Sequence, residues 1–399
     1  MSSLSKKKIF HFCFLILFFF NLVFPKGGIK VAAIPLTWGC FFLSLVSFLS
    51  ITRTYYKVSK NHLILYVLTI PFQIMGLIAV LLNFSNNVGF SISFLVTFIF
   101  FPFLFYLVFS EYIDKIDLKL LIKYLKNGIF FVSIFGVIQF FFRIFTGKFI
   151  QIPLLTLNLH DFGSLETTKC ILRGNISKLI STYNNGNIYG ICMLMFFPLI
   201  SIVEKRKINK IIFKISLILT LSRTVWIGMI FAELVTLCFL SNKNIFKKII
   251  PIVYVILIIG IIIKVQNWNL SFIFDSTLGG RSGLFEGLKN ITFFPKSFHK
   301  TDSVYYINEI VYISILNNIG LFGFIFFIMG FFAPMILFFK NYYRKNTLRV
   351  AILLGLVVYY FCCLSDGAML FIPTMIFYWF LSSLMFASDL TESEMELTY

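Results

Sequence analysis

Long, continuous apolar runs constrain the fold of this chain more than any other feature. Each run is about 20 residues long, which matches a helix that crosses a bilayer core of about 30 Å. The runs lack the alternation of a membrane-embedded β-strand, so we expect them to form helices. With 59% hydrophobic and only 13% charged residues, the composition excludes a soluble protein of 399 residues.

We therefore predict an all-α polytopic integral membrane protein that forms a single membrane domain over residues 1–399. About 12 transmembrane helices are expected from the apolar runs. One of them, 209–222, is short for a full span. The predicted spans are 9–25, 32–51, 63–83, 88–109, 127–146, 187–203, 209–222, 224–241, 249–265, 319–339, 350–364 and 368–387.

The basic residues predict how these spans are oriented. Lys and Arg favour the cytoplasmic side, and placing Lys6 to Lys8 there keeps most of the 35 basic residues inside. Both termini are then cytoplasmic, and two long polar segments, 147–186 and 266–318, face outward, the second of them partly helical. Because topology explains most of the net charge of +19, no nucleic-acid partner is implied. The remaining outward positive charge suits an anionic substrate or lipid head groups.

The second polar segment contains a candidate anion site around Arg281. Gly279 and Gly280 permit a turn that exposes backbone N–H groups, and Ser282 can cap a short helix that follows. A glycine turn, an arginine and a helix N-terminus together suit a phosphate, to which the planar guanidinium donates in pairs. The alternative is a surface turn with a solvated arginine.

The same segment continues into a polar helix face that could hold a sugar. Asp302, Tyr305, Glu309 and Tyr312 are spaced three, four and three residues apart, so they share one face of a helix. Carboxylates bind hydroxyls, and His299 at the start of this helix could act as a base near neutral pH. Alternatively, Asp302 is a helix cap and the tyrosines form an interfacial belt.

Three further polar residues are candidates for substrate binding. Arg223 lies between two short apolar runs, where it either binds a substrate phosphate or snorkels to lipid. Arg173 is an exposed cation in the first long loop, and Asn187 lies in the turn before the span that follows.

Glu233 is too far along its helix to pair with Arg223, and we expect it to make a structural hydrogen bond. With four His and no His/Cys cluster at ligand spacing, a metal site is not expected.

The order of these motifs resembles the O-antigen polymerase and O-antigen ligase superfamily of bacterial envelope glycosyltransferases. The resemblance covers about 170–340 by motif and the whole chain by span layout. The motifs in order are Arg173 with Asn187 to Gly190, then Ser222-Arg223, then Gly280-Arg281 with Pro295, and then His299, Asp302 and Tyr305 leading to Gly320 and Gly323.

Membership would imply a metal-independent enzyme without cofactors that acts on the periplasmic face of the bacterial inner membrane. Its donor would be an undecaprenyl-pyrophosphate-linked oligosaccharide, and a chain-length regulator protein is among the partners that such an enzyme could have. Arg173, Arg223 and Arg281 would bind pyrophosphate, and His299 or Asp302 would serve the acceptor hydroxyl. Tyr305 and Glu309 would contact sugar.

The motif spacing favours a polymerase over a ligase. Ligases of this superfamily carry a His followed by a small polar residue, with Gly-x-x-Gly about ten residues later. Here Lys300 follows His299, and Gly320 lies much further along. A lipid-linked oligosaccharide flippase is the alternative from another class, although such transporters tend to show repeated halves and charged residues at the bilayer midplane.

Overall fold

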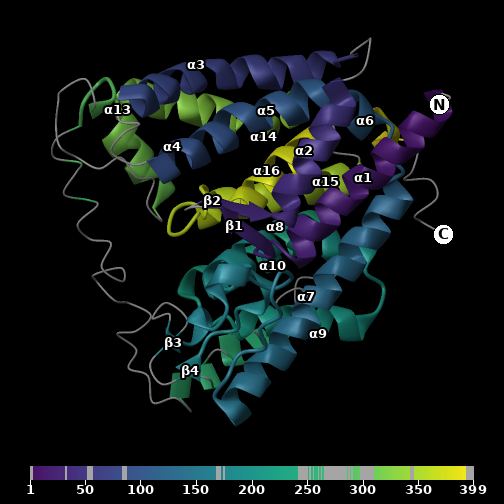
Figure 1. The fold of residues 1–399 in the computed structure, drawn as a ribbon. Helices are drawn as coiled ribbons and strands as arrows, with labels where there is room; N and C mark the ends of the chain where they lie inside the picture. Colours follow the sequence, from purple (N-terminus) through teal and green to yellow (C-terminus); the bar gives the residue numbers. More distant parts are fainter. Residues whose placement is uncertain are drawn as a thin grey trace.

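The structure is a computed structural model that is dominated by helices (Figure 1). It describes residues 3–31, 34–51, 57–82, 88–167, 172–173, 176–240, 310–341 and 346–391. Between 250 and 296 it describes positions 250, 253–254, 256–258, 260–261, 263–264, 285, 288 and 291–296.

Helices form nearly all of the regular structure. The α-helices are α1 (Ser3–Val23), α2 (Trp38–Ile51), α3 (Lys60–Leu82), α4 (Val88–Leu95), α5 (Phe101–Phe103), α6 (Ser110–Asp114), α7 (Leu118–Thr146), α8 (Gly186–Val203), α9 (Lys207–Ile218), α10 (Arg223–Leu240), α13 (Val311–Phe331), α14 (Ala333–Lys340), α15 (Thr347–Cys362) and α16 (Ile372–Leu384). Two π-helical segments, η1 (Val96–Phe100) and η2 (Leu104–Val108), flank α5. Short 3-10 helices are η3 (Leu159–Asp161), η4 (Ser164–Thr167), η6 (Ser181–Tyr183) and η11 (Ser388–Thr391).

The predicted class, an all-α membrane protein, agrees with this architecture. Among the described residues, 6 helical stretches are long and apolar enough to cross a membrane, and four shorter apolar helices accompany them. The long stretches are Lys60–Leu82, Val88–Val108, Leu118–Thr146, Gly186–Val203, Arg223–Leu240 and Val311–Phe331. The predicted span 209–222 corresponds to α9, whose 12 residues would extend only about 18 Å. The predicted span 249–265 is described only at scattered positions, and most of the segment 266–318 lies outside the described residues.

Helix α7 begins earlier than the predicted span 127–146. The carboxylate of Asp117 accepts a hydrogen bond from the Leu120 N–H at 3.0 Å and caps the helix at its true start. At the other end Gly147 adopts φ 73° and closes the helix by a bond from its N–H to the Arg143 carbonyl at 2.9 Å. The basic first turns of α7 therefore extend the apolar run as one continuous helix.

Helices α8 and α15 form the centre of the bundle. Every residue of α8 from Tyr189 to Ile200 is buried, and α15 packs closely against it. The approach is tight because a Cβ on Gly355 would meet the Met195 carbonyl oxygen at 2.1 Å. Only glycine fits at that crossing.

Helix α13 reverses direction at Gly320, so its two arms lie beside each other. Gly320 has φ 83° and ψ 178°, which is not helical. The ring of Tyr312 lies 6.3 Å from that of Phe327 and 6.3 Å from that of Phe332, whereas 15 residues of straight helix would separate two rings by about 22 Å. The run 319–339, predicted as one span, thus begins at a sharp bend. Although Val311–Phe331 is long enough to cross a membrane, it does not do so as one straight helix.

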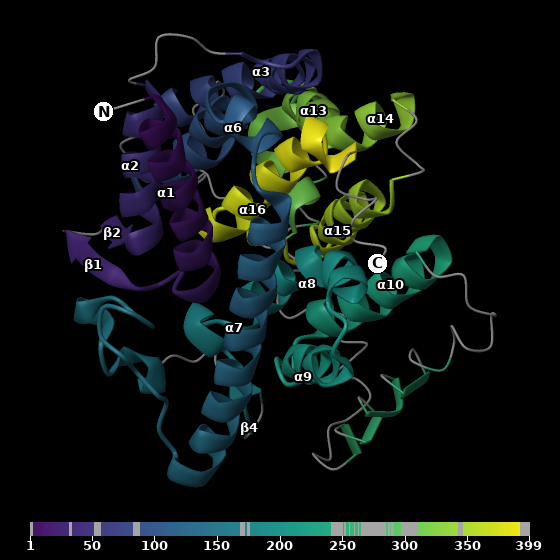
Figure 2. The ribbon, with the colours of Figure 1, turned by 90° about the vertical axis from the view of Figure 1, so that its right-hand side faces the viewer.

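The structure also contains two small antiparallel β-hairpins, which the prediction of an all-α protein did not include. Strands β1 (Gly28–Val31) and β2 (Ile34–Thr37) pair with Gly28 opposite Thr37, and β3 (Leu172–Arg173) pairs with β4 (Ile176–Ser177). The first hairpin lies beside the first long loop, since the indole N–H of Trp38 donates to the Leu154 carbonyl at 2.7 Å. Figure 2 shows β1 and β2 beyond the end of α1 and the start of α2.

The segments that connect the helices lie at two opposite ends of the bundle, as a hydrogen bond and an ion pair show. At one end, which we call the loop end, α1 and α7 finish, and α8 and α10 begin. Tyr183 of the first long loop donates to the Leu22 carbonyl there at 3.0 Å. At the opposite end, which we call the basic end, Lys126 of α7 lies 3.6 Å from Glu204 after α8. This grouping follows the alternation expected of successive spans.

Candidate functional site

A polar cluster at the loop end joins three separate parts of the chain. It contains Asn187 at the start of α8, Arg223 and Thr224 at the start of α10, and Ser365 and Asp366 in the turn between α15 and α16. We call these five residues the Asn187–Asp366 cluster. Two of them, Asn187 and Arg223, were predicted to bind substrate.

Asp366 is the buried centre of this cluster. Its side chain is 5% exposed, and one oxygen, Oδ2, accepts a hydrogen bond from Asn187 Nδ2 at 3.0 Å. The other oxygen accepts a bond from the Ala368 N–H at 3.3 Å. The neighbouring Ser365 hydroxyl lies 2.8 Å from that of Thr224. The turn is therefore fixed to the starts of both α8 and α10.

Local sequence explains why Asn187 is held in position. Asn185 caps α8, because its side-chain oxygen accepts bonds from the Asn187 N–H at 2.9 Å and the Ile188 N–H at 3.3 Å. Gly186 lets the first loop come close, since a Cβ there would meet the Leu179 carbonyl oxygen at 2.6 Å. The sequence Asn-Gly-Asn thus produces both the helix start and the close contact.

Several cations lie at the loop end together with the cluster. Arg223 is the first residue of α10, and Lys178 is buried beside Gly186, where an added Cβ would lie 3.4 Å from the Cβ of Lys178. Lys26 Nζ lies 4.7 Å from the centroid of the Phe371 ring. Arg143 Nε donates to the Ser177 hydroxyl at 3.3 Å. Positive charge at this end favours an anionic ligand.

Acceptor oxygens without a protein partner occur in the first long loop and at the start of α8. The side-chain oxygens of Asn158, Thr182, Asn184 and Asn187 are buried and accept no hydrogen bond within the described protein. Buried polar atoms are nearly always satisfied in native structures. In Asn187, the amide nitrogen is used by Asp366, so the oxygen is oriented away from that carboxylate and can accept a bond from a hydroxyl.

Strained backbone accompanies the same loops. Four non-glycine residues here have positive φ, namely Ser181 (49°), Asn184 (56°), Leu221 (50°) and Ala368 (45°). Such conformations cost of order 1–3 kcal/mol and persist where the surroundings impose them, as they do at binding and catalytic sites. Leu221 lies two residues before Arg223, so the strain is close to a predicted substrate-binding residue.

Arg173, which was predicted to bind substrate, lies a few residues before a part of the chain that reaches the loop end near Arg223. Arg173 lies in β3 opposite Ile176, and the chain then continues to Lys178. The Leu179 N–H donates to the Leu219 carbonyl at 2.9 Å, four residues before Arg223. The Arg173 side chain is outside the described residues.

The other predicted site residues also lie outside the described residues. They are Arg281, His299 and Asp302, expected to act in catalysis, and Tyr305 and Glu309, expected to contact sugar. The chain that follows them is described: the Val311 N–H donates to the Cys363 carbonyl at 3.2 Å. A Cβ on Gly367 would lie 2.4 Å from a Val311 methyl group. The second long segment therefore ends against the turn that carries Asp366.

Sequence reasoning missed Ser365, Asp366, Lys178 and Lys26 as members of this site. A signal was present for two of them, because Ser365-Asp366-Gly367 interrupts the apolar runs between the last two predicted spans. No local pattern distinguishes Lys26 or Lys178 from other loop lysines.

Among the described residues, no group of three or more His, Cys, Asp or Glu side chains could hold a metal ion.

Comparisons with protein-family models, with curated proteins and with solved structures find no match to this chain. What the protein does must therefore be inferred from its own residues.

Proposed function

We propose that this protein is a membrane glycosyltransferase that polymerises undecaprenyl-pyrophosphate-linked oligosaccharide repeat units of a surface polysaccharide such as O-antigen. It would act at the periplasmic face of the bacterial inner membrane, with both termini in the cytoplasm. The loop end of the bundle would face the periplasm.

One observation carries this proposal. Asn187 and Arg223, chosen from the sequence alone, lie at one polar cluster, where Asn187 and Thr224, the residue after Arg223, bond to the turn of Ser365 and Asp366; the chain that follows His299, Asp302 and Arg281 packs against the same turn. Residues from both long polar segments are thereby led to one end of the bundle. A polymerase with a site built from two outward loops requires such a convergence.

The chemistry of the cluster suits a glycosyl pyrophosphate. Arg223, Arg173 and Arg281 would bind the pyrophosphate through charge-assisted hydrogen bonds. The unpartnered amide oxygens of Asn184 and Asn187 would accept hydrogen bonds from sugar hydroxyls. Asp366 would act as a positioning residue, because it orients the Asn187 amide.

In the proposed reaction an acceptor hydroxyl of the new lipid-linked repeat attacks the anomeric carbon of the growing chain. The bond from that carbon to the pyrophosphate oxygen breaks, and its electron pair stays with the departing lipid pyrophosphate. His299 or Asp302 takes the proton of the attacking hydroxyl. The arginines stabilise the negative charge that develops on the leaving group.

Deletion and complementation in the native host test this function, with lipopolysaccharide read on a silver-stained gel. Loss of the ladder to core bearing a single repeat, with restoration by the intact chain, would support a polymerase. Arg223→Ala and Arg281→Ala should fail to restore the ladder, whereas Arg206→Ala, an exposed arginine at the basic end, should restore it.

Other outcomes of this experiment would point to other functions. Bare core with polymer accumulating on the lipid carrier would indicate a ligase. Repeat units retained on the cytoplasmic side would indicate a flippase. An unchanged gel would require the capsule to be examined by the same comparison before the polymerase could be retained.

A further inference from the structure

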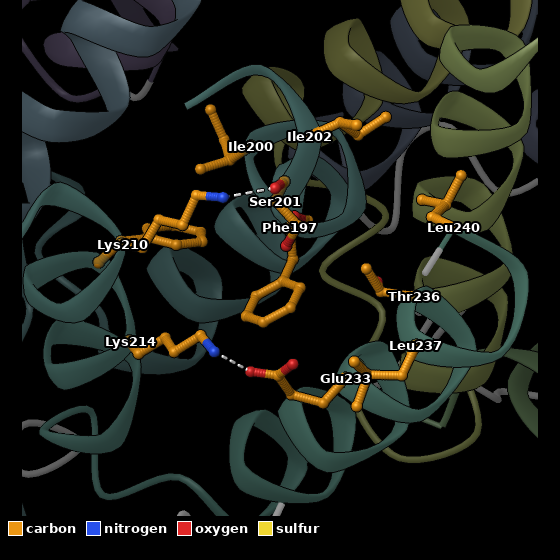
Figure 3. A pocket seen from close by; sticks show the side chains of 11 residues that line it. Phe197, Ile200, Ser201, Ile202, Lys210, Lys214, Glu233, Thr236, Leu237 and Leu240 are labelled. Carbon is orange, nitrogen blue, oxygen red and sulfur yellow. Dashed lines mark hydrogen bonds and ion pairs between the residues drawn. The ribbon is translucent and has the colours of Figure 1, made fainter. Parts of the chain in front are cut away.

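A second polar site lies at the basic end, between α8, α9 and α10. It is a cavity of about 300 Å³, close to the lower limit for small-molecule sites. Figure 3 shows Lys210 and Lys214 of α9 on one side and Glu233 and Thr236 of α10 on the other. The cavity is distinct from the Asn187–Asp366 cluster, which lies at the loop end.

The charged side chains are arranged across this cavity. Lys214 forms an ion pair with Glu233, so the structural contact expected of Glu233 is with a charged partner. Lys210 Nζ donates to the Ser201 carbonyl at 2.6 Å. Two ammonium groups and one carboxylate give the cavity a net charge of about +1, the complement of a singly charged anion.

A buried hydroxyl points to a ligand independently of these charges. Thr236 is 8% exposed and lines the cavity, yet its Oγ1 has no hydrogen-bond partner within the described protein. Thr236 follows Glu233 by three residues, so both lie on the face of α10 toward the cavity. A hydroxyl in this position can donate to a ligand oxygen.

The outer faces of the two walls indicate that the cavity adjoins lipid. On α9, Ile208, Ile211 and Ile215 are exposed and follow each other at helical spacing. On α10, Leu234 and Phe239 are also exposed. Two apolar lining residues, Ile202 and Leu240, are partly exposed and form an apolar rim, which suits the first carbons of an acyl chain.

Helix α9 begins at the basic end and brings two lysines to the cavity. It carries Lys210 and Lys214 on the side that lines the cavity, together with its exposed apolar face. Basic pockets between membrane helices bind phosphate head groups of lipids. A cavity with lysines inside and an apolar rim fits such a ligand better than it fits a water-soluble one.

We propose that this cavity binds the phosphodiester head group of a membrane phospholipid. Lys210 and the Thr236 hydroxyl donate to the phosphate oxygens, and Lys214, held by Glu233, supplies a second positive charge. The carboxylate of Glu233 disfavours a phosphate monoester, which carries more negative charge than the cavity can balance. The acyl chains leave over the apolar rim into the bilayer.

Native mass spectrometry of the full-length protein in detergent tests this site by titration with phosphatidylglycerol. Lys210→Gln should weaken binding about fivefold, the effect of one lysine near an anionic lipid. Lys207→Gln is the matched control, because it removes the same charge from an exposed position three residues away, and binding should stay unchanged. Equal losses in the two variants would overturn the proposal, since they would indicate general surface attraction.

Thr236→Val separates binding from a structural role. Valine has the shape of threonine without the hydroxyl, and the hydroxyl lacks a partner among the described residues, so stability should not fall. Binding of phosphatidylglycerol should weaken about fivefold, the worth of one hydrogen bond of about 1 kcal/mol. Unchanged binding in this variant would show that the Thr236 hydroxyl does not contact the lipid, and it would contradict the assignment.

Ligand variation completes the test. Diacylglycerol with the same acyl chains, which lacks the phosphate, should bind at least fivefold more weakly than phosphatidylglycerol. Phosphatidic acid should bind no more tightly than phosphatidylglycerol; tighter binding would contradict selection of a phosphodiester. Displacement of the lipid by an equal concentration of water-soluble glycerophosphoglycerol would show that the acyl chains contribute nothing and would overturn the lipid assignment.

Discussion

Replacing Gly320 by alanine should destabilise the protein strongly, because both the backbone conformation and the packing at this position require glycine. Gly320 has φ 83° and ψ 178°, a region that is essentially reserved for glycine and costs other residues of order 1–3 kcal/mol. An added Cβ would also lie 2.6 Å from the Phe294 carbonyl oxygen and 2.8 Å from its carbon. Both are backbone atoms, so the segment 291–296 has to move.

That movement breaks two backbone hydrogen bonds. The Leu321 N–H donates to the Thr292 carbonyl at 2.9 Å, and the Phe322 N–H donates to the Phe293 carbonyl at 3.1 Å. Each bond contributes a net stabilisation of about 1 kcal/mol. Together with the backbone strain, the expected loss in the free energy of unfolding is about 3–5 kcal/mol.

Gly147→Ala is the matched control for this prediction. Gly147 also has positive φ, 73°, but a Cβ there would meet no atom within 4 Å. Only the backbone conformation is penalised, which costs about 1–2 kcal/mol. Unfolding in mixed micelles at increasing SDS fraction gives both free energies, and a Gly320→Ala loss no larger than that of Gly147→Ala would refute the packed reversal of α13.

Three further predictions concern polar contacts. In a double-mutant cycle, Asn187→Ala and Asp366→Ala should show a coupling energy of about 1–3 kcal/mol, measured by unfolding; additive losses would contradict their hydrogen bond. Lys214→Met should cost about 1–3 kcal/mol, and Glu233→Met in the same chain should recover part of that stability, because loss of the partly exposed lysine otherwise leaves a buried carboxylate unpaired. Burial alone would raise the pKa of Glu204, but bonds from the Arg206 N–H and Asn209 and the charge of Lys126 hold the pKa below its ordinary value of 4.5. A lowered pKa means that this carboxylate stabilises the fold above pH 4.5 and loses that effect as the pH falls through the lowered pKa; the stability difference between the native chain and Glu204→Gln should therefore be present at pH 7 and disappear in stronger acid.

The sequence predicts the helical class because the apolar runs are long and continuous. It also predicts the turn before α8 and the start of this helix, expected at 187 and found at Gly186. The reversal of α13 could not be predicted, because Ile319 and the residues after it form one unbroken apolar run. The bend depends on contact between Gly320 and Phe294, a contact that no local pattern encodes.

The candidate site was predictable only in part for a similar reason. Asn187 and Arg223 were recognised because each is a polar residue next to an apolar run. The turn that holds Ser365 and Asp366 bonds to Asn187 and to Thr224, the residue after Arg223, and it follows both by more than 140 residues. Such pairings arise from how the helices pack, and a single sequence contains no measure of that packing.

The most direct test of the proposed function uses the purified protein in liposomes with its lipid-pyrophosphate-linked repeat unit. We expect a ladder of lipid-linked products that lengthens with time, with release of undecaprenyl pyrophosphate and loss of both in Arg223→Ala. Movement of the intact repeat across the bilayer with no new glycosidic bond would contradict a polymerase. Transfer of the glycan only to added lipid A-core would contradict it equally.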